Sequence, residues 1–355
     1  MTANLNVVES QQIVSTDLKN ILIVKLSAIG DVIHALPVSH AIKKTFPDSK
    51  ITWVVEPPAL EIVKMNPCVD NIILFHKKDF RSFMGFAKKF IPFRREIQDQ
   101  YYDAVLDLQG LFKSAAIAFF AKSDIKLGIC DMRELSGKIS KPVVGDHCRG
   151  HIVDRYLDTA KAIGCEIDEV KFPLEIPEDE EIKAKEIFQR AGGNLEVPYV
   201  IFVIGANWPN KRWSIDHFAL LSDWLYNMNV MPVFVGNGPV DEQRAADIEA
   251  MIEIPPINLV NKTNWAQLAS LIKNSRLVIG GDTGAVHLAA ALGTRTLMLM
   301  GPTDANRNGA YGQIENSLEV DRPCKGCWKR SCPKGADCLE KITVRQVEEK
   351  IINMK

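Results

Sequence analysis

Short apolar runs alternate with amphipathic segments along most of the chain. In the first half these runs are rich in β-branched residues and show little polar alternation, at residues 21–25, 51–55, 71–75 and 104–108. Strands that are buried on both faces of a parallel sheet have this pattern. The segments between them predict helices over residues 32–45, 80–98 and 111–121. Pro37 lies inside the first of these, so we expect a kink or a late start there.

The same alternation resumes in the second half. Apolar runs occur at residues 199–204, 230–236, 257–260, 276–280 and 295–300. Helical patterns separate them, and the last residues, "TVRQVEEKIINMK", form one more amphipathic helix. Two such series predict an α/β protein with two Rossmann-like domains, whose parallel sheets face a central cleft.

An acidic, proline-flanked segment over residues 174–198 lies between the two series, and we expect the domain boundary there. We therefore predict four parts, namely a flexible leader over 1–20, domains over 21–185 and 186–340, and a C-terminal helix over 341–355.

Composition narrows the class of protein. Hydrophobic residues make up 46% of the chain, charged residues 25%, and the formal net charge is −1. No global charge therefore attracts nucleic acid or an anionic membrane. The first 20 residues lack the basic start and apolar core of a secretory signal. The apolar runs are far shorter than the roughly 20 residues that span a bilayer. We therefore expect a cytoplasmic protein without nucleic-acid partners.

Two strand ends carry residues suited to chemistry, because ligands of open α/β sheets bind outside the carboxyl ends of the strands. The first is "KLSAIGDVIHALP", where Gly30 permits a tight turn and Asp31 lies near a helix start. Asp31 is either a helix N-cap or a general base at the edge of a cleft.

The second strand end is "VIGGDTGAVHLAAALG". Thr283 and Gly284 fall at a helix N-terminus, whose free amides and dipole favour an anion. His287 follows one turn later on the same face. This set suits a phosphate or pyrophosphate, and the alternative is a capped helix with a core histidine.

Lys211 in "GANWPNKRW" follows the first strand of the second half and could direct an ammonium group at the same anion, or lie on the surface. No Walker motif occurs, and "GNGPVDEQ" lacks the third glycine of the dinucleotide fingerprint. A standard P-loop or NAD site is therefore disfavoured.

The eight cysteines form two groups. Four are scattered, and we expect them to be reduced in a cytosolic protein: Cys68, Cys130, Cys148 and Cys165. The other four lie in "CKGCWKRSCPKGADC": Cys324, Cys327, Cys332 and Cys338. Four thiols this close together could hold a structural Zn²⁺ or an iron–sulfur cluster, or could pack as reduced thiols in a loop.

Six motifs together resemble one known family. In chain order they are "ILIVKLSAIGDVIHALP", "ITWVVE", "DLQGLFKSA", "NKRW", "GDTGAVHLAAALGT" and "GPTDANRNGAYG". Their order and spacing resemble the lipopolysaccharide heptosyltransferases of glycosyltransferase family nine, and most closely the heptosyltransferase I subfamily. The cysteine-rich tail resembles relatives of the heptosyltransferase II type.

The resemblance implies a GT-B fold, with an N-terminal acceptor domain, a C-terminal nucleotide-sugar domain and a terminal helix that crosses back to the first domain. The implied donor is ADP-L-glycero-D-manno-heptose, and the implied acceptor is Kdo linked to lipid A at the inner membrane surface. The implied transfer inverts the anomeric centre and requires no metal or cofactor. We expect a monomer that associates peripherally with the inner face of the cytoplasmic membrane.

The resemblance also implies roles for individual residues. Asp31 matches the family's base, and Lys211 matches the lysine that stabilises the departing diphosphate. The donor-binding motif matches Asp282, Thr283, Gly284 and His287. Ala206 and Asn207 stand where the type I subfamily carries hydroxyl residues near the phosphates, which is a departure from its pattern.

We expect cationic side chains in the first domain to bind an acceptor that carries carboxylates and phosphates. Candidates are Lys77, Lys78, Arg81, Lys113, Arg133 and Arg155. The segment over residues 80–97 interleaves phenylalanines with basic residues. It either docks on the anionic membrane or packs into the first domain.

Three rival functions are weighed against transfer to Kdo. One is transfer to the first heptose, as in heptosyltransferase II. Another is a metal-binding protein organised around the C-terminal cysteines, without transferase activity. An NAD-dependent oxidoreductase is the third, and the missing fingerprint weighs against it.

Overall fold

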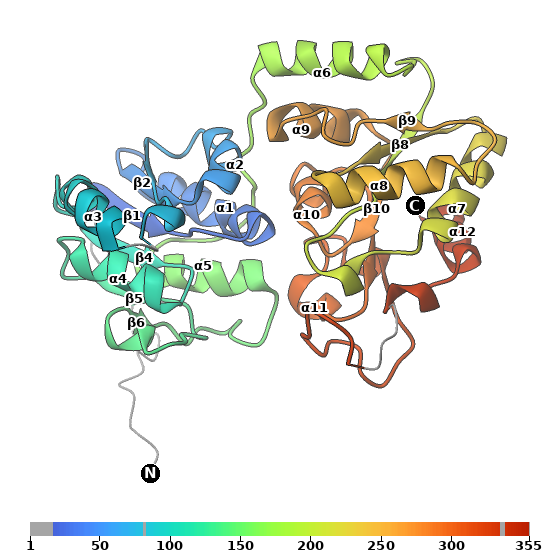
Figure 1. Cartoon of the computed structure of the whole chain (residues 1–355). Coiled ribbons are helices and arrows are strands. Elements are labelled where there is room, and N and C mark those ends of the chain that lie inside the picture. The colour runs from blue at the N-terminus through green and yellow to red at the C-terminus, as the bar shows by residue number, and fades with distance from the viewer. Residues whose placement is uncertain (1–16, 81–82, 334–337, 355) are drawn as a thin grey trace. The chain divides into compact units, whose positions relative to one another are not determined.

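The computed structural model describes residues 17–80, 83–333 and 338–354. The chain divides into two compact units, Met1–Glu175 and Ile176–Lys355, each built on its own sheet (Figure 1). The predicted boundary at 185/186 is therefore ten residues too late. The boundary lies earlier because α6 (Glu178–Arg190) packs on α9 (Trp265–Asn274) and so belongs to the second unit. At this contact Glu180 accepts hydrogen bonds from the side chains of Asn264 and Gln267.

The first unit contains a six-stranded parallel sheet in the order β3-β2-β1-β4-β5-β6. The strands are β1 (Asn20–Val24), β2 (Lys50–Val55), β3 (Asn71–Leu74), β4 (Ala104–Asp107), β5 (Lys126–Gly128) and β6 (Lys141–Pro142). Ile21 pairs with Ile51 on one side and with Ala104 on the other, so β1 lies at the centre. The strand order reverses between β1 and β4, where open α/β sheets bind their ligands.

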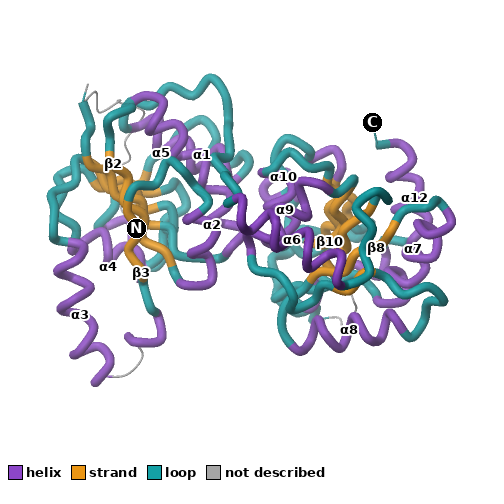
Figure 2. The backbone as a smooth tube through the Cα atoms, turned by 90° about the horizontal axis from the view of Figure 1, so that it is seen from above, coloured by secondary structure: helices purple, strands orange, loops and turns teal. Residues whose placement is uncertain are grey.

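Helices cover both faces of this sheet (Figure 2). They are α1 (Ile29–Thr45), α2 (Leu60–Lys64), α3 (Phe83–Ile97), α4 (Phe112–Phe120) and α5 (Ile152–Ala162). α1 packs on α5, and Ile97 of α3 and Ile117 of α4 join the core with strand residues such as Leu22. The expected late start of the first helix is wrong, since α1 begins at Ile29 and continues through Pro37.

The second unit repeats the plan with the order β12-β11-β10-β7-β8-β9. Its strands are β7 (Tyr199–Val203), β8 (Met231–Val235), β9 (Ile257–Asn258), β10 (Leu277–Gly281), β11 (Thr296–Met300) and β12 (Ser317–Glu319). Besides α6 and α9, its helices are α7 (Ile215–Asn227), α8 (Pro239–Glu249), α10 (Gly284–Ala291), α11 (Ala305–Asn308) and α12 (Val344–Asn353). Within the described ranges, no helix is long and apolar enough to cross a membrane.

The C-terminal helix α12 belongs to the second unit. Val347 is fully buried in the core of that unit, and α12 contacts α7. The segment before it is tied to the same unit, because the Trp213 indole N–H donates to the Ile342 carbonyl at 2.8 Å. The helix is therefore part of the second unit and not a separate fourth part, and its crossing back to the first domain stays a prediction.

One pair of scattered cysteines is joined. Cys130 and Cys148 form a disulfide between the loop after β5 and the loop before α5, with their Cα atoms 5.9 Å apart. The expectation that all four scattered cysteines are reduced is wrong for this pair, because the parallel sheet brings two loops distant in sequence to the same edge. Cys68 and Cys165 are free thiols.

Candidate active site

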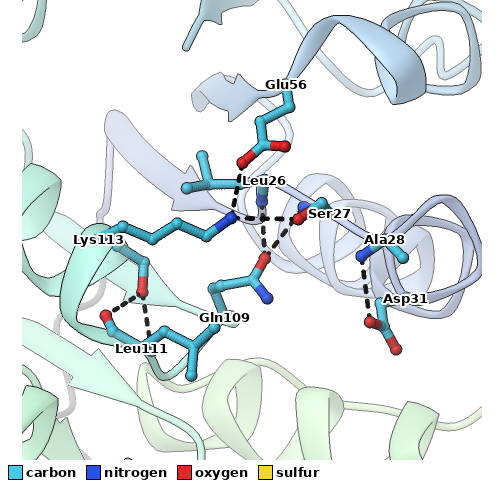
Figure 3. Close-up of polar contacts among 9 residues, drawn as sticks. Leu26, Ser27, Ala28, Asp31, Glu56, Gln109, Leu111 and Lys113 are labelled. Atoms are coloured by element: carbon cyan, nitrogen blue, oxygen red, sulfur yellow. Dashed lines mark hydrogen bonds and ion pairs between the residues drawn. The ribbon is translucent and has the colours of Figure 1, made fainter. Parts of the chain in front are cut away.

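The loop after β1 is anchored by a side chain from the neighbouring strand (Figure 3). Gln109 follows β4, and its Oε1 accepts hydrogen bonds from the backbone N–H groups of Leu26 at 3.1 Å and Ser27 at 3.0 Å. These two N–H groups lie beyond the end of β1, and Gln109 provides their hydrogen-bond acceptor. This loop leads directly into α1, so Gln109 sets where the first turn of α1 begins.

Asp31 lies in the first turn of α1. Ala28 occupies the N-cap position, and the Asp31 Oδ2 accepts the Ala28 backbone N–H at 3.2 Å (Figure 3). The side chain of Asp31 therefore caps the helix from its third position, not as the N-cap. Asp31 is partly exposed at the carboxyl edge of the sheet. A carboxylate held in this way can accept a proton from a substrate hydroxyl.

Two buried ionisable residues lie behind this loop, and the sequence analysis missed both. Lys25 is 2% exposed, and its Nζ donates to the Leu108 carbonyl at 3.0 Å and the Tyr156 hydroxyl at 2.7 Å. Asp107 is fully buried and accepts the backbone N–H groups of Gln109 and Gly110. Burial raises the pKa of Asp107. The signal was visible as a charged residue at the end of one apolar run and one position before the end of another.

In the second unit, Asp282 lies between the side chains of Lys211 and His287. Its Oδ2 is 2.6 Å from the Lys211 Nζ, and its Oδ1 is 2.7 Å from the His287 Nε2. Burial alone would raise the pKa of Asp282, but the hydrogen bonds and charges of His287 and Lys211 hold this pKa well below its usual range. Asp282 is thus ionised and fixes the position of the Lys211 ammonium group.

Glycine at the end of β10 makes this pairing possible. A Cβ atom on Gly281 would lie 2.0 Å from the Lys211 carbonyl oxygen. The turn over Pro209–Lys211 can therefore approach the strand end only because residue 281 has no side chain. Lys211 Nζ also lies 4.6 Å from the ring centroid of Trp208, which favours its positive charge.

The helix N-terminus predicted at Thr283 and Gly284 is present, and anion binding there stays a prediction. Thr283 is the N-cap residue and Gly284 is the first helical residue. The Thr283 Oγ1 is buried and lacks a hydrogen-bond partner within the described part of the chain. Unpaired amides at a helix N-terminus next to a lysine form an environment that favours a phosphate.

The remaining donor-side candidates lie close in sequence to this turn or this helix. His287 is 3% exposed and bonds Asp282, so it supports that carboxylate from a buried position, in line with the core histidine that was the alternative interpretation. Ala206 is partly exposed and Asn207 is exposed after the end of β7. The Ala206 carbonyl accepts the Arg212 Nε at 2.8 Å.

The candidate cations of the acceptor side differ in whether their charges are paired with carboxylates. Lys113 is paired with Glu56 at 2.6 Å, and its Nζ lies 3.3 Å from the Ser27 hydroxyl (Figure 3). Arg155 is 8% exposed, forms a close ion pair with Asp131 and donates to the Gly150 carbonyl. The structure therefore places both in internal networks and not on an open surface.

Three further candidates complete the acceptor-side set. Arg133 is exposed in the loop after β5, and Lys77 and Lys78 are exposed in the turn after β3. Arg81 lies outside the described residues. Since β3 and β5 are parallel, these exposed cations follow carboxyl strand ends of the same sheet as Asp31.

The C-terminal cysteines lie next to the donor-side loops. Cys338 is buried, and a Cβ atom on Gly301 would lie 2.8 Å from its Sγ. Within the same segment, the Lys329 carbonyl accepts the Asn210 Nδ2 at 2.6 Å. A metal at Cys324, Cys327, Cys332 and Cys338 stays a prediction.

Comparison with known proteins identifies the family. The model of glycosyltransferase family 9 (heptosyltransferase) matches residues 91–336. Lipopolysaccharide heptosyltransferase 1 of Pseudomonas aeruginosa is 28% identical over 318 residues, which cover 88% of this chain and 87% of the relative. Lipopolysaccharide heptosyltransferase 1 of Escherichia coli K12 is 27% identical over 85% of this chain and 94% of the relative.

Solved structures agree on the fold. E. coli heptosyltransferase WaaC with ADP superposes with a TM-score of 0.73 at 26% identity, over 94% of this chain and 99% of that chain. A family 9 glycosyltransferase from Veillonella parvula gives a TM-score of 0.81 at 23% identity, over 96% of this chain and 97% of that chain. The predicted GT-B fold class is confirmed. The chain belongs to glycosyltransferase family 9, the heptosyltransferases.

Proposed function

We propose that this glycosyltransferase transfers L-glycero-D-manno-heptose from ADP-heptose to Kdo of the lipopolysaccharide inner core. The observation that carries the proposal is the Lys211–Asp282–His287 cluster beside the N-terminus of α10. A diphosphate needs positive charge and hydrogen-bond donors. Lys211 provides an ammonium group, and the N-terminus of α10 provides the Thr283 hydroxyl and free backbone amides.

On the donor side, Lys211 stabilises the departing ADP. As the bond between the anomeric carbon and the diphosphate oxygen breaks, negative charge grows on that oxygen. Lys211 is held in place by Asp282, so its charge needs little reorganisation at that moment. Thr283 and the amides of Gly284 and its neighbours bind the remaining phosphate oxygens in this proposal.

On the acceptor side, Asp31 acts as the general base. It takes the proton from the attacking Kdo hydroxyl while the oxygen forms a bond to the anomeric carbon, and ADP leaves from the opposite face. One base and one leaving-group stabiliser suffice for inversion. Gln109 and Ala28 orient the turn that carries this carboxylate.

The choice of Kdo as acceptor rests on the relatives. Relatives from P. aeruginosa, E. coli and Campylobacter coli, 25–28% identical over 85–88% of this chain, are named lipopolysaccharide heptosyltransferase 1, and one from Haemophilus influenzae, 25% identical over 85%, is named core heptosyltransferase OpsX. Relatives named lipopolysaccharide heptosyltransferase 3 cover 78% of this chain. The acceptor implied by the resemblance lies at the inner membrane surface, so we propose that the protein works at the cytoplasmic face of that membrane.

Mass spectrometry of the transfer products tests the substrate assignment. The protein is incubated with ADP-heptose and either Kdo₂-lipid A or the same acceptor already carrying one heptose. We expect a mass increase of one heptose on Kdo₂-lipid A alone. Product only from the heptosylated acceptor would assign the type II reaction, and no product from either would overturn the proposed donor or acceptor class.

A further inference from the structure

Helix α4 presents aromatic side chains to the outside of the first unit. Phe112 and Phe119 are seven residues apart, two helical turns, and therefore share one face, with the small Ala116 between them. Phe112 is 64% exposed and Phe119 is 61% exposed. The opposite face of the same helix, including Ala115 and Ala118, is buried in the core. A helix that packs well on one side thus leaves two large aromatic side chains in contact with solvent on the other.

The loop after β5 extends this apolar face at the N-terminal end of α4. Leu135 is 73% exposed, and the neighbouring Glu134 accepts the Phe112 backbone N–H at 3.0 Å. Glu134 and Leu135 both have left-handed backbone conformations, with φ of 54° and 63°. Such conformations are unfavourable for residues other than glycine, so the loop holds an apolar side chain outward at an energetic cost.

Helix α3 lies beside α4 and extends the surface further (Figure 1, Figure 2). The rings of Phe90 on α3 and Phe120 on α4 are 5.1 Å apart, which joins the two helices along their outer sides. Ile91 on α3 is 54% exposed. We call the set of Ile91, Phe112, Phe119 and Leu135 the α3–α4 surface.

Positive charge borders this surface. Between residues 88 and 96, α3 exposes four basic side chains and one acidic side chain, namely Lys88, Lys89, Arg94, Arg95 and Glu96. The guanidinium of Arg94 lies 5.3 Å from the centre of the Phe120 ring, so cation and aromatic side chain are intermingled. The whole chain has a net charge of −1, so this local excess of positive charge is a property of the helix.

We propose that the α3–α4 surface docks the protein on an anionic lipid bilayer. Aromatic and aliphatic side chains enter the interface between headgroups and acyl chains, and the surrounding lysines and arginines attract anionic headgroups. This charge complementarity favours a lipid surface over a second copy of the chain, since two copies would bring like charges together.

Docking on this surface also orients the acceptor side of the site. Phe112 precedes Lys113, whose ammonium group lies at Ser27 in the loop that carries Asp31. The N-terminal end of the exposed face of α4 therefore leads to the strand edge where the base lies. This inference rests on the proposed function in one respect, which is that the acceptor is linked to a lipid.

Vesicle flotation tests the docking without any substrate. The full chain is mixed with vesicles of equal parts phosphatidylglycerol and phosphatidylcholine, or of phosphatidylcholine alone. We expect flotation with the anionic vesicles that weakens at high salt. The double variant Phe112→Ser/Phe119→Ser should bind them about ten-fold less tightly or worse, because two aromatic side chains no longer enter the interface. Lys88→Glu/Lys89→Glu should also weaken binding.

A matched variant controls for the loss of exposed apolar residues in general. Leu220→Ser/Ile352→Ser removes two comparably exposed side chains from α7 and α12 of the second unit and should float like the unaltered chain. Circular dichroism verifies that each variant is folded. Equal flotation of the α4 variant and the unaltered chain, or no flotation of either, would overturn the proposal.

Two further readouts separate the possible explanations. If light scattering shows an oligomer for the unaltered chain and a monomer for the α4 variant, the surface is an interface between copies, and lipid docking is wrong.

Transfer to a deacylated, soluble acceptor should be unchanged in the α4 variant. Flotation without transfer to any acceptor would refute the proposed function and leave the docking intact, whereas transfer without flotation would refute the docking alone.

Discussion

The Lys211 ammonium group lies 2.6 Å from the Asp282 carboxylate, and His287 contacts the other oxygen of that carboxylate at 2.7 Å. Three residues from two loops and one helix therefore form a single cluster at the carboxyl ends of β7 and β10, in which Asp282 and His287 are buried and Lys211 is partly buried. The cluster both stabilises the second unit and fixes a positive charge beside the N-terminus of α10.

Replacing Lys211 with methionine should lower kcat for transfer by about 100-fold or more, since a fixed charge on the leaving group is lost. Removing one partner of a buried pair should also destabilise the unit by about 3 kcal/mol. Steady-state kinetics and urea unfolding measure the two effects. Lys185→Met, an exposed lysine on α6 of the same unit, is the control and should leave both unchanged. Unaltered turnover in the Lys211 variant would contradict its role.

The stability that Asp282 contributes should depend on pH. Its pKa is lower in the folded chain than in the unfolded chain, where a carboxyl of this type titrates near about 4. The contribution is therefore complete above that pH and is lost as the pH falls below it toward the folded pKa. Asp282→Asn should lower the free energy of unfolding more at pH 7 than at pH 3. An equal difference at the two pH values in urea titrations would argue against an ionised Asp282.

Gly281→Ala should disrupt the donor side without changing any charge. Its Cβ would lie 2.0 Å from the Lys211 carbonyl oxygen, so the turn must move away from β10. We expect a loss of about 2 kcal/mol in unfolding free energy and weaker ADP binding in calorimetry. Gly137→Ala in the first unit, where the nearest side-chain atom is 3.3 Å away, is the control. Normal ADP affinity in the Gly281 variant would show that the close approach is not needed.

Gln109 should act as a positioning residue for Asp31. Gln109→Ala leaves two backbone N–H groups without their acceptor, which costs about 2 kcal/mol of stability and should lower kcat while ADP affinity stays constant. Gln109→Glu keeps an oxygen that can accept both hydrogen bonds and should recover most of the lost stability. If the glutamate variant is as unstable as the alanine variant, hydrogen bonding to the loop is not what Gln109 provides.

Much of the fold could be predicted, because buried parallel strands have a distinctive sequence pattern. Each predicted strand run corresponds to a strand of the two sheets, and the N-terminus of α10 occurs where Thr283 and Gly284 indicated it. The domain boundary could not be placed as well, since the amphipathic pattern of α6 does not reveal that its partner is α9.

The sequence singled out candidate site residues but did not indicate the contacts among them. Asp31 and Lys211 stood out by their position after strands, and the resemblance to the family's donor-binding motif added Asp282. That Lys113 would pair with Glu56 depends on the distance between segments 57 residues apart in the chain. Asp282 and His287 are only five residues apart, but their hydrogen bond depends on how the loop enters α10. The disulfide between Cys130 and Cys148 could not be predicted either, because the pairing of β5 with β6 brings these two loops together.

The central claim is that Asp31 removes the proton from the acceptor hydroxyl during transfer. A rapid-quench, single-turnover measurement with Asp31→Asn tests it most directly, with the exposed Asp48→Asn as the control and ADP affinity measured in parallel. The account predicts that the Asp31 variant binds ADP normally but transfers heptose at least about 100-fold more slowly, and that the control equals the unaltered enzyme. A single-turnover rate in Asp31→Asn equal to that of the unaltered enzyme would contradict the account.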